Sequence, residues 1–314
     1  MKTKGNLPKA ALSAVMVLLL CFPKLSLEGA RRGLLLWYQT VLPTLLPFMV
    51  CTNLITAMNG VKFLAAPAVP VFGRLLGLSE NGCFVLISGV LCGYPLGAKA
   101  CSDFLDQGLI SLPEARSLYA VSSFPSPMFL AGFVMAKARQ AAGQALFLPL
   151  WKVAASLYLP LFPMFVLAGR LYGFSGIRNI CSSRNFGSAS PKACFPLDQA
   201  LMDSIHLMVK IGGYLMIFSI LAQYLQAFFP PGLFSVLLIA AAEMTTGIDA
   251  AARFLPGASG IFPILWAAAF GGFSGVFQVK SVTKNVGLSI RHYILWKLLH
   301  SLMACFFLML FLYQ

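Results

Sequence analysis

The sequence is short of charge, and above all of negative charge. Its 314 residues include only 9 acidic side chains against 23 Lys and Arg, and charged residues make up 10% of the chain. A soluble globular domain carries about 25% charged residues. Together with 59% hydrophobic residues, this composition excludes an ordinary soluble fold and predicts an all-α polytopic membrane protein.

Patterns that would define other classes of protein are also missing. Transmembrane β-strands need segments of alternating polarity, roughly ten residues long, whereas the apolar runs here are continuous. The chain has no P-loop, no H-E-x-x-H motif, no nucleotide-binding glycine pattern and no C-x-x-C pair among its 8 cysteines. We therefore expect no cofactor and no metal.

The net charge of +14 would suggest nucleic-acid binding in a soluble protein. No aromatic-rich basic domain is present to do this, so we expect no nucleic-acid partner. An excess of Lys and Arg is typical of cytoplasmic loops and attracts anionic lipid or an anionic solute. Membrane lipid and a small anionic solute are the expected partners, and a homo-oligomer is compatible with the sequence.

The apolar runs predict three units and six to eight transmembrane helices. Residues 1–170 form a first membrane repeat with an N-terminal helix, 171–197 a polar basic loop, and 198–314 a second membrane repeat. In the first unit we expect a helix at 8–22, an interfacial segment at 27–38, a span at 41–58, a surface-lying or partly inserted segment at 61–78, and spans at 118–136 and 145–168. In the second we expect a long helix at 198–229, a span at 261–279 and a final helix at 294–313.

Two further helices are broken within apolar sequence. The stretch 82–104 is interrupted at Gly93-Tyr94-Pro95, and the stretch 233–254 is interrupted between Glu243 and Gly247. Backbone groups freed by such breaks survive in lipid only where protein or a water-filled cavity satisfies them. In secondary transporters, broken helices near the bilayer middle mark the binding site.

The two halves of the chain match each other. An offset of 150 places Gly97 against Gly247, and an offset of 148 places Ser126 against Ser274. With the N-terminus cytoplasmic and both broken stretches re-entrant, most Lys and Arg residues fall inside, as the positive-inside tendency requires. The two hairpins then enter from opposite faces, which predicts an inverted repeat.

The half-helices that follow the breaks supply the candidate site. Pro95 suits the first helical position, which would leave the N–H groups of Leu96, Gly97 and Ala98 unpaired and directed at an anion. Lys99 would add a full charge nearby. We expect the half-helices to converge on one midplane site, with these substrate-binding residues: Gly93, Tyr94, Pro95, Gly97, Lys99, Ser126, Thr245, Thr246, Gly247, Ser274 and Gln278.

Capping residues support this expectation. Ser126 precedes Pro127 in the order of an N-cap and a first helical residue, and Ser274-Gly275 repeats the position. Thr245 and Thr246 are expected to cap a half-helix that opens at Gly247. Glu243 is the one carboxylate deep in an apolar run, so it is the coupling candidate, with an ion pair to Lys210 as the alternative.

Two other interpretations of the same residues stay open. The glycines at the breaks would also permit close packing of helices without any site. Gly272-Phe273-Ser274-Gly275 has the G-x-S-G form used by rhomboid intramembrane proteases, and His300 lies on the next helix. No small-residue motif follows His300, so we expect that the protein is not an enzyme.

Several of these motifs also resemble a known family. They are Val41-Leu42-Pro43, Leu46-Pro47-Phe48, Gly93-Tyr94-Pro95-Leu96-Gly97-Ala98-Lys99, Glu114-Ala115 and Ser126-Pro127-Met128-Phe129. Together they resemble the sporulation integral membrane protein family of the YlbJ (SpoVV) type, which belongs with proteins carrying the nucleoside-recognition (Gate) domain. The second half departs from the pattern, with Glu243-Met244-Thr245-Thr246-Gly247 in place of a second Gly-Tyr-Pro.

The resemblance implies a multi-pass protein of a spore-former's cell membrane, in the mother-cell or outer forespore membrane, needed for spore maturation. It also implies passage of dipicolinate, a small aromatic dicarboxylate. The expected function is therefore transport of a small organic anion. The alternatives are a non-transporting membrane scaffold of sporulation and a nucleoside-type transporter.

Overall fold

The computed structural model describes residues 7–58, 60–61, 65–143, 148–174, 197–283 and 287–312. Within these ranges the chain is helical and has no strand, which confirms the all-α prediction. Five described helices are long and apolar enough to cross a membrane: Pro23–Ala57, Leu150–Tyr172, Leu197–Phe228, Ala258–Val282 and Ile290–Leu312. A sixth is counted if the bent pair Val69–Leu76 and Glu80–Cys92 is one span.

The segment Pro23–Ala57 is one continuous helix rather than an interfacial segment and a separate span. Helix α1 (Leu7–Cys21) is followed by α2 (Pro23–Leu36), a π-helical turn η2 (Trp37–Val41) and α3 (Leu42–Ala57), without a break between the last three. Pro43 lies in the first turn of α3, where its missing N–H is tolerated, and the π-helical turn directly precedes it. Two short elements follow, η3 (Val69–Gly73) and α5 (Arg74–Leu76).

Helix α2 crosses the long helix α13 (Leu197–Phe228) at two glycines four residues apart. A Cβ on Gly29 would lie 2.7 Å from the Cα of Ile220, and one on Gly33 would lie 2.8 Å from the Cα of Met216. Membrane helices approach this closely only through small residues, most often in a G-x-x-x-G pattern. The motif Gly29-Ala30-Arg31-Arg32-Gly33 is present in the sequence, but the sequence analysis did not use it.

Each half of the chain then contains a hairpin, a broken helix and an outer helix, in that order. In the first half the hairpin consists of α6 (Glu80–Cys92) and α7 (Leu96–Asp106). The broken helix consists of α8 (Leu112–Val121), α9 (Pro127–Phe129), η4 (Leu130–Val134) and α10 (Met135–Ala142). The outer helices are α11 (Leu150–Tyr158) and α12 (Leu161–Tyr172). In the second half they are the hairpin α14 (Leu233–Ala242) and α15 (Met244–Phe254), the broken helix α16 (Ala258–Phe270) and α17 (Gly272–Val282), and the outer helix α18 (Ile290–Leu312).

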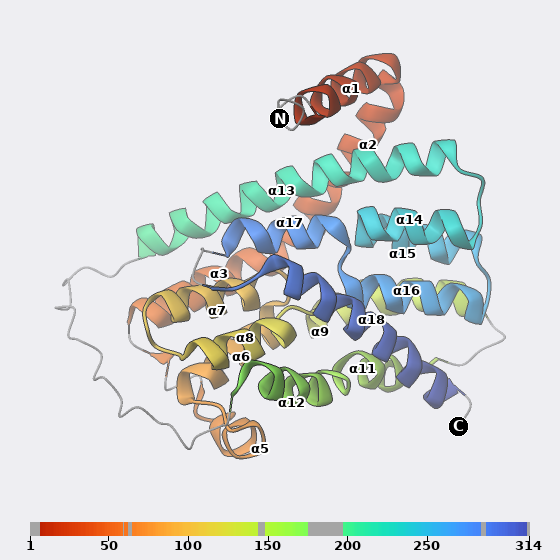
Figure 1. Ribbon diagram of the computed structural model, residues 1–314. Coiled ribbons are helices and arrows are strands. Elements are labelled where there is room, and N and C mark those ends of the chain that lie inside the picture. Colours follow the sequence, from red (N-terminus) through yellow and green to blue (C-terminus); the bar gives the residue numbers. More distant parts are fainter. Residues whose placement is uncertain are drawn as a thin grey trace.

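The hairpins enter from opposite ends of the molecule (Figure 1). Helices α6 and α7 occupy one end, α14 and α15 occupy the other, and their tips face each other near the middle, while α13 runs along both. This arrangement agrees with the inverted repeat that the sequence predicts. The end that holds α6 and α7 also holds the start of α13. Residues 175–196 of the predicted basic loop, together with Lys62 and Lys284, lie outside the described residues.

An exchanged ion pair agrees with the predicted match between the two hairpins. In α7, Lys99 Nζ lies 2.7 Å from Asp103 Oδ2, and in α15, Arg253 Nη2 lies 2.7 Å from Asp249 Oδ2. The offset of 150 that aligns the breaks also aligns Lys99 with Asp249 and Asp103 with Arg253. The same helix positions therefore hold the same i,i+4 pair with its charges exchanged.

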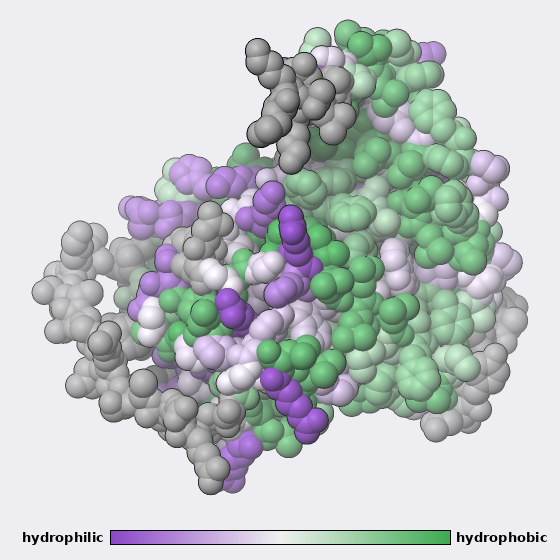
Figure 2. Space-filling view, in the orientation of Figure 1, coloured by the Kyte–Doolittle hydropathy of each residue, from purple (hydrophilic) through white to green (hydrophobic). Residues whose placement is uncertain are grey.

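The surface matches a membrane location. Figure 2 shows a broad apolar face over the right-hand part of the molecule, where α14 and α16 lie, with hydrophilic side chains gathered toward the end where α13 begins. On α18, Leu295, Leu302 and Phe306 are more than half exposed. Large apolar side chains with this exposure are suited to contact with lipid chains rather than water.

Candidate functional site

The four helix breaks meet around one cavity. It measures about 90 Å³, and polar side chains from all four breaks line it. The lining includes Tyr94, Ser126, Glu243, Thr245, Ser274 and Gln278, while helices α3 and α13 close it with Thr44, Leu45, Ile211 and Leu215. Five of the eleven predicted binding residues and the coupling candidate are thus brought together.

The two serines line the cavity in different ways. Ser126 is the N-cap of α9, its Oγ accepts a hydrogen bond from the Phe129 N–H at 3.3 Å, and Pro127 is the first helical residue, as the sequence predicted. Ser274 does not cap its helix, because α17 begins at Gly272 with Gly271 as N-cap. Its Oγ instead accepts from Gln278 Nε2 at 3.1 Å. In both serines the hydroxyl oxygen is an acceptor, which leaves the hydroxyl proton free to donate.

Glu243 caps the second hairpin tip, and the prediction that Thr245 and Thr246 cap a half-helix opening at Gly247 was wrong. Helix α15 begins at Met244, and the carboxylate of Glu243 accepts from the N–H of Thr245 at 3.1 Å and of Thr246 at 2.7 Å. Both threonine hydroxyls donate to it as well. Glu243 is 1% exposed, whereas Lys210 is exposed on α13, and no ion pair between them is found in the described part of the chain. Its charge is stabilised by the start of its own helix.

The first hairpin tip also satisfies its own backbone. Pro95 is the N-cap of α7 rather than its first residue. The N–H groups of Leu96 and Gly97 both donate to the carbonyl of Gly93, at 3.0 and 3.3 Å. For Leu96 and Gly97 the prediction that these groups stay unpaired and face a solute was therefore wrong, because the tight turn at Gly93 brings a carbonyl under the start of the helix.

Three of the predicted glycines serve close packing. Gly93 has φ of +71°, and a Cβ on it would lie 2.9 Å from the Ser126 N. A Cβ on Gly97 would lie 1.8 Å from the Ser122 carbonyl oxygen, and one on Gly247 would lie 2.1 Å from the Cα of Ala240. Without side chains, these glycines let the hairpins contact the backbone of their neighbours.

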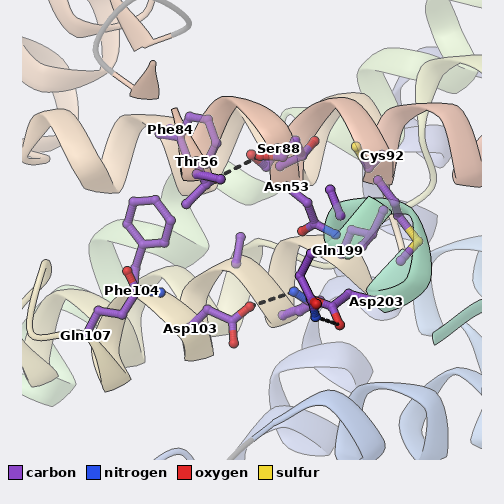
Figure 3. A pocket seen from close by; sticks show the side chains of 17 residues that line it. Asn53, Thr56, Phe84, Ser88, Cys92, Asp103, Phe104, Gln107, Gln199 and Asp203 are labelled. Atoms are coloured by element: carbon purple, nitrogen blue, oxygen red, sulfur yellow. Dashed lines mark hydrogen bonds and ion pairs between the residues drawn. The ribbon is translucent and has the colours of Figure 1, made fainter. Parts of the chain in front are cut away.

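Lys99 lies in a second and wider cavity of about 240 Å³ (Figure 3). Helices α3, α6, α7 and α13 line it, and Asn53, Ser88, Asp103 and Gln199 face the same space. Lys99 is half-buried there and paired with Asp103. Cys92 lines both cavities, so the wider one also borders the first hairpin tip.

Sequence analysis missed Lys297 on α18. Its side chain is 1% exposed, and its Nζ donates to Tyr94 Oη and to the Ser123 carbonyl, both at 2.7 Å. The signal was a lysine inside an apolar run, where charge is costly and usually functional. The predicted start of this helix, at residue 294, placed Lys297 near a helix end, whereas α18 begins at Ile290.

Ser274 and His300 do not form the pair that a serine protease needs. His300 is buried, and its Nε2 donates a hydrogen bond to the Leu157 carbonyl oxygen at 2.8 Å. Ser274 is hydrogen-bonded to Gln278. Nucleophilic catalysis requires direct hydrogen bonding between the nucleophile and its base.

The helical spans, the apolar surface and the inverted pair of hairpins define the chain as a multi-pass integral membrane protein. Comparison with curated proteins then places it beside sporulation integral membrane protein YlbJ of Bacillus subtilis (strain 168). The two are 24% identical over 328 residues, which cover 92% of this chain and 78% of the relative. This similarity confirms the resemblance to the YlbJ-type family of sporulation membrane proteins.

Two other comparisons add no further relative. No family model matches the chain, so the nucleoside-recognition (Gate) domain stays a prediction. No solved structure matches it either.

Proposed function

We propose that the protein is a transporter, and not an enzyme, that moves a small organic anion across the cytoplasmic membrane of a spore-forming bacterium. The observation that carries this proposal is the cavity lined by polar groups from four separate helix breaks. Breaks at this depth are expected only where the backbone borders a solute path or is satisfied by protein. The family resemblance makes dipicolinate the first solute to test and spore maturation the process served.

The polar groups around the cavity support an anion. Ser126 and Ser274 each have a hydroxyl proton available to donate, and the ammonium of Lys297 lies one hydrogen bond behind Tyr94. The carboxylate of Glu243 opposes an anion, but four donors at the start of α15 already stabilise it. Charge-assisted hydrogen bonds from hydroxyls are the contacts that a carboxylate solute favours.

The wider cavity would be the access route to the central one. A buried apolar cluster that includes Met49, Leu96, Ile211 and Leu215 separates them. Met49 and Leu96 line the wider cavity, and Ile211 and Leu215 line the central one. At about 90 Å³ the central cavity is smaller than the roughly 300 to 1,000 Å³ typical of ligand pockets. Admission of a solute would therefore require the first hairpin tip to move away from α3 and α13.

Flux of labelled dipicolinate into proteoliposomes tests the proposal, with Ser274→Ala as the site variant. Loss of one hydrogen bond to a charged group costs about 1.5 to 3 kcal/mol, which corresponds to roughly a 10- to 100-fold loss of affinity. Ser281→Ala is the matched control, because it makes the same change on the same helix at a serine whose Oγ bonds to the Gln278 carbonyl rather than lining the cavity. We expect flux in the wild type and the control, and reduced flux at low solute concentration in Ser274→Ala.

The other outcomes of this assay identify the alternatives. Equal flux in liposomes without the protein and in proteoliposomes would support a non-transporting scaffold of sporulation. Competition of the flux by nucleosides would favour a nucleoside-type transporter, for which the carboxylate of Glu243 would accept hydrogen bonds from sugar hydroxyls.

A further inference from the structure

Lys297 is a fully buried lysine that forms no ion pair with any acidic side chain among the described residues. Its Nζ is held by Tyr94 Oη and the Ser123 carbonyl, and it lies 4.6 Å from the centroid of the Tyr94 ring. A buried charge usually requires a counter-charge, since its desolvation costs several kcal/mol.

The ends of two broken helices supply the compensating charge. Ser123 lies two residues beyond the end of α8, and its carbonyl accepts directly from Lys297. Tyr94 Oη, which accepts from Lys297, has its single hydroxyl proton shared between the carbonyls of Ala268 and Ala269, both at 3.0 Å and in the last turn of α16. The carboxyl end of a helix carries a partial negative charge. The ammonium thus faces two such ends, one directly and one through Tyr94.

This position has a known use in broken-helix transporters. In that architecture the unwound carbonyls and the carboxyl ends of half-helices coordinate the coupling cation, close to the solute site. Here the breaks that follow α8 and α16 both border the central cavity, and Tyr94 lines it. Helix α18 packs against both α8 and α16 and places its lysine between them.

We propose that the ammonium of Lys297 is a resident cation that takes the place of a bound alkali cation at the paired helix breaks. It holds the ends of α8 and α16 together, so the site forms without added sodium. The position of the cation stands on the contacts above, whereas its consequence for flux rests on the proposed transport function. The two are tested by separate measurements.

Replacing Lys297 by alanine should create a site for a small alkylammonium ion. Lys297→Ala removes three methylene groups and the ammonium, which together match the propylammonium ion. In the detergent-solubilised protein we expect propylammonium to raise the unfolding midpoint of Lys297→Ala by roughly 2 to 4 °C when it is present at several times its dissociation constant. Propanol, which lacks the charge, should not do so.

Two control variants separate a resident cation from simple packing. Lys297→Met fills the same volume without charge, so propylammonium should leave its midpoint unchanged. Lys280→Ala removes an exposed lysine on α17 and should respond to neither compound. Equal effects of propylammonium and propanol on Lys297→Ala would show that only volume matters and would overturn the proposal.

Flux provides the second measurement. Wild-type proteoliposomes should carry dipicolinate equally well in sodium chloride and in choline chloride. Lys297→Ala should lose flux and recover it with propylammonium. A wild-type flux that requires sodium would overturn the resident-cation proposal and leave transport standing. Absence of any wild-type flux would refute the transport function, while the unfolding experiment would still decide the position of the cation.

Discussion

Gly97 is where the first hairpin depends most on the absence of a side chain. A Cβ there would lie 1.8 Å from the Ser122 carbonyl oxygen and 2.8 Å from the Cα of Gly89. Both are backbone atoms that no rotamer change can move. Ordinary contact begins near 3.4 Å, so Gly97→Ala must displace α7 from the break after α8 by about 1.6 Å. Overpacking of this kind costs about 1 to 3 kcal/mol.

The assay is thermal unfolding in detergent together with solute flux. A cost of 1 to 3 kcal/mol corresponds to a fall of roughly 2 to 12 °C in the midpoint. Because the displaced segment also carries Tyr94 at the cavity, flux should fall as well, while membrane insertion is retained. Gly213→Ala is the control, since a Cβ on this α13 glycine meets nothing within 4 Å. A Gly97→Ala protein as stable and as active as Gly213→Ala would refute the packing that the hairpin is built on.

Two further predictions concern other parts of the chain. Gly33→Leu should separate α2 from α13, because its side chain would meet the backbone of Met216; the unfolding midpoint should fall, whereas Leu34→Ala at an exposed position should change it little. Glu114 lies outside the candidate spans, and burial raises its pKa above the usual 4.5, although hydrogen bonds from the Ser79 N–H and hydroxyl partly offset this. A raised carboxyl pKa favours the protonated folded state, so this contribution to stability is present below pH 4.5 and is lost as pH rises through the folded pKa. Glu114→Gln keeps the hydrogen-bond acceptor without the charge, so the wild type should lose stability relative to this variant from mildly acidic to mildly alkaline pH. Plots of unfolding midpoint against pH that run parallel for the two proteins would contradict the raised pKa of Glu114.

The sequence located the breaks well, because glycine and proline interrupt helices by local sterics. The hairpin tips fall at Gly93 and Glu243, and the broken helices at Ser126 and Gly271, within the predicted stretches. The pairing of the halves also followed from the sequence, since the offset between the breaks is a property of the chain alone.

The sequence did not show which groups satisfy the backbone at each break, because that depends on how the chain turns. The carbonyl of Gly93 occupies the place predicted for a solute at the start of α7, and Glu243 does the same at α15. The direction of a helix face is also a tertiary property. Lys99 lies on the face of α7 that looks toward α3 and α13, so it borders the wider cavity.

Lys297 shows how an error in a helix boundary conceals a buried charged residue. Glu114, too, stands in a polar stretch of the sequence, at 103–116, yet it is 5% exposed and lies beneath the start of α6. In both residues a charged side chain near a predicted helix end proved to be deep in the protein. The ends of helices are the part of a fold that local patterns define least well.

Solute protection of a thiol placed in the central cavity tests the main claim most directly. Gly275 lines that cavity, and a Cβ there meets nothing within 4 Å, so Gly275→Cys places a side chain in open space. Cys51, which like Cys21 is an exposed native thiol, serves as the internal reference for labelling by a small anionic thiol reagent. We predict that dipicolinate slows labelling of Gly275→Cys several-fold and leaves Cys51 unaffected. Labelling at the same rate with and without the solute would contradict a solute site where the four breaks meet.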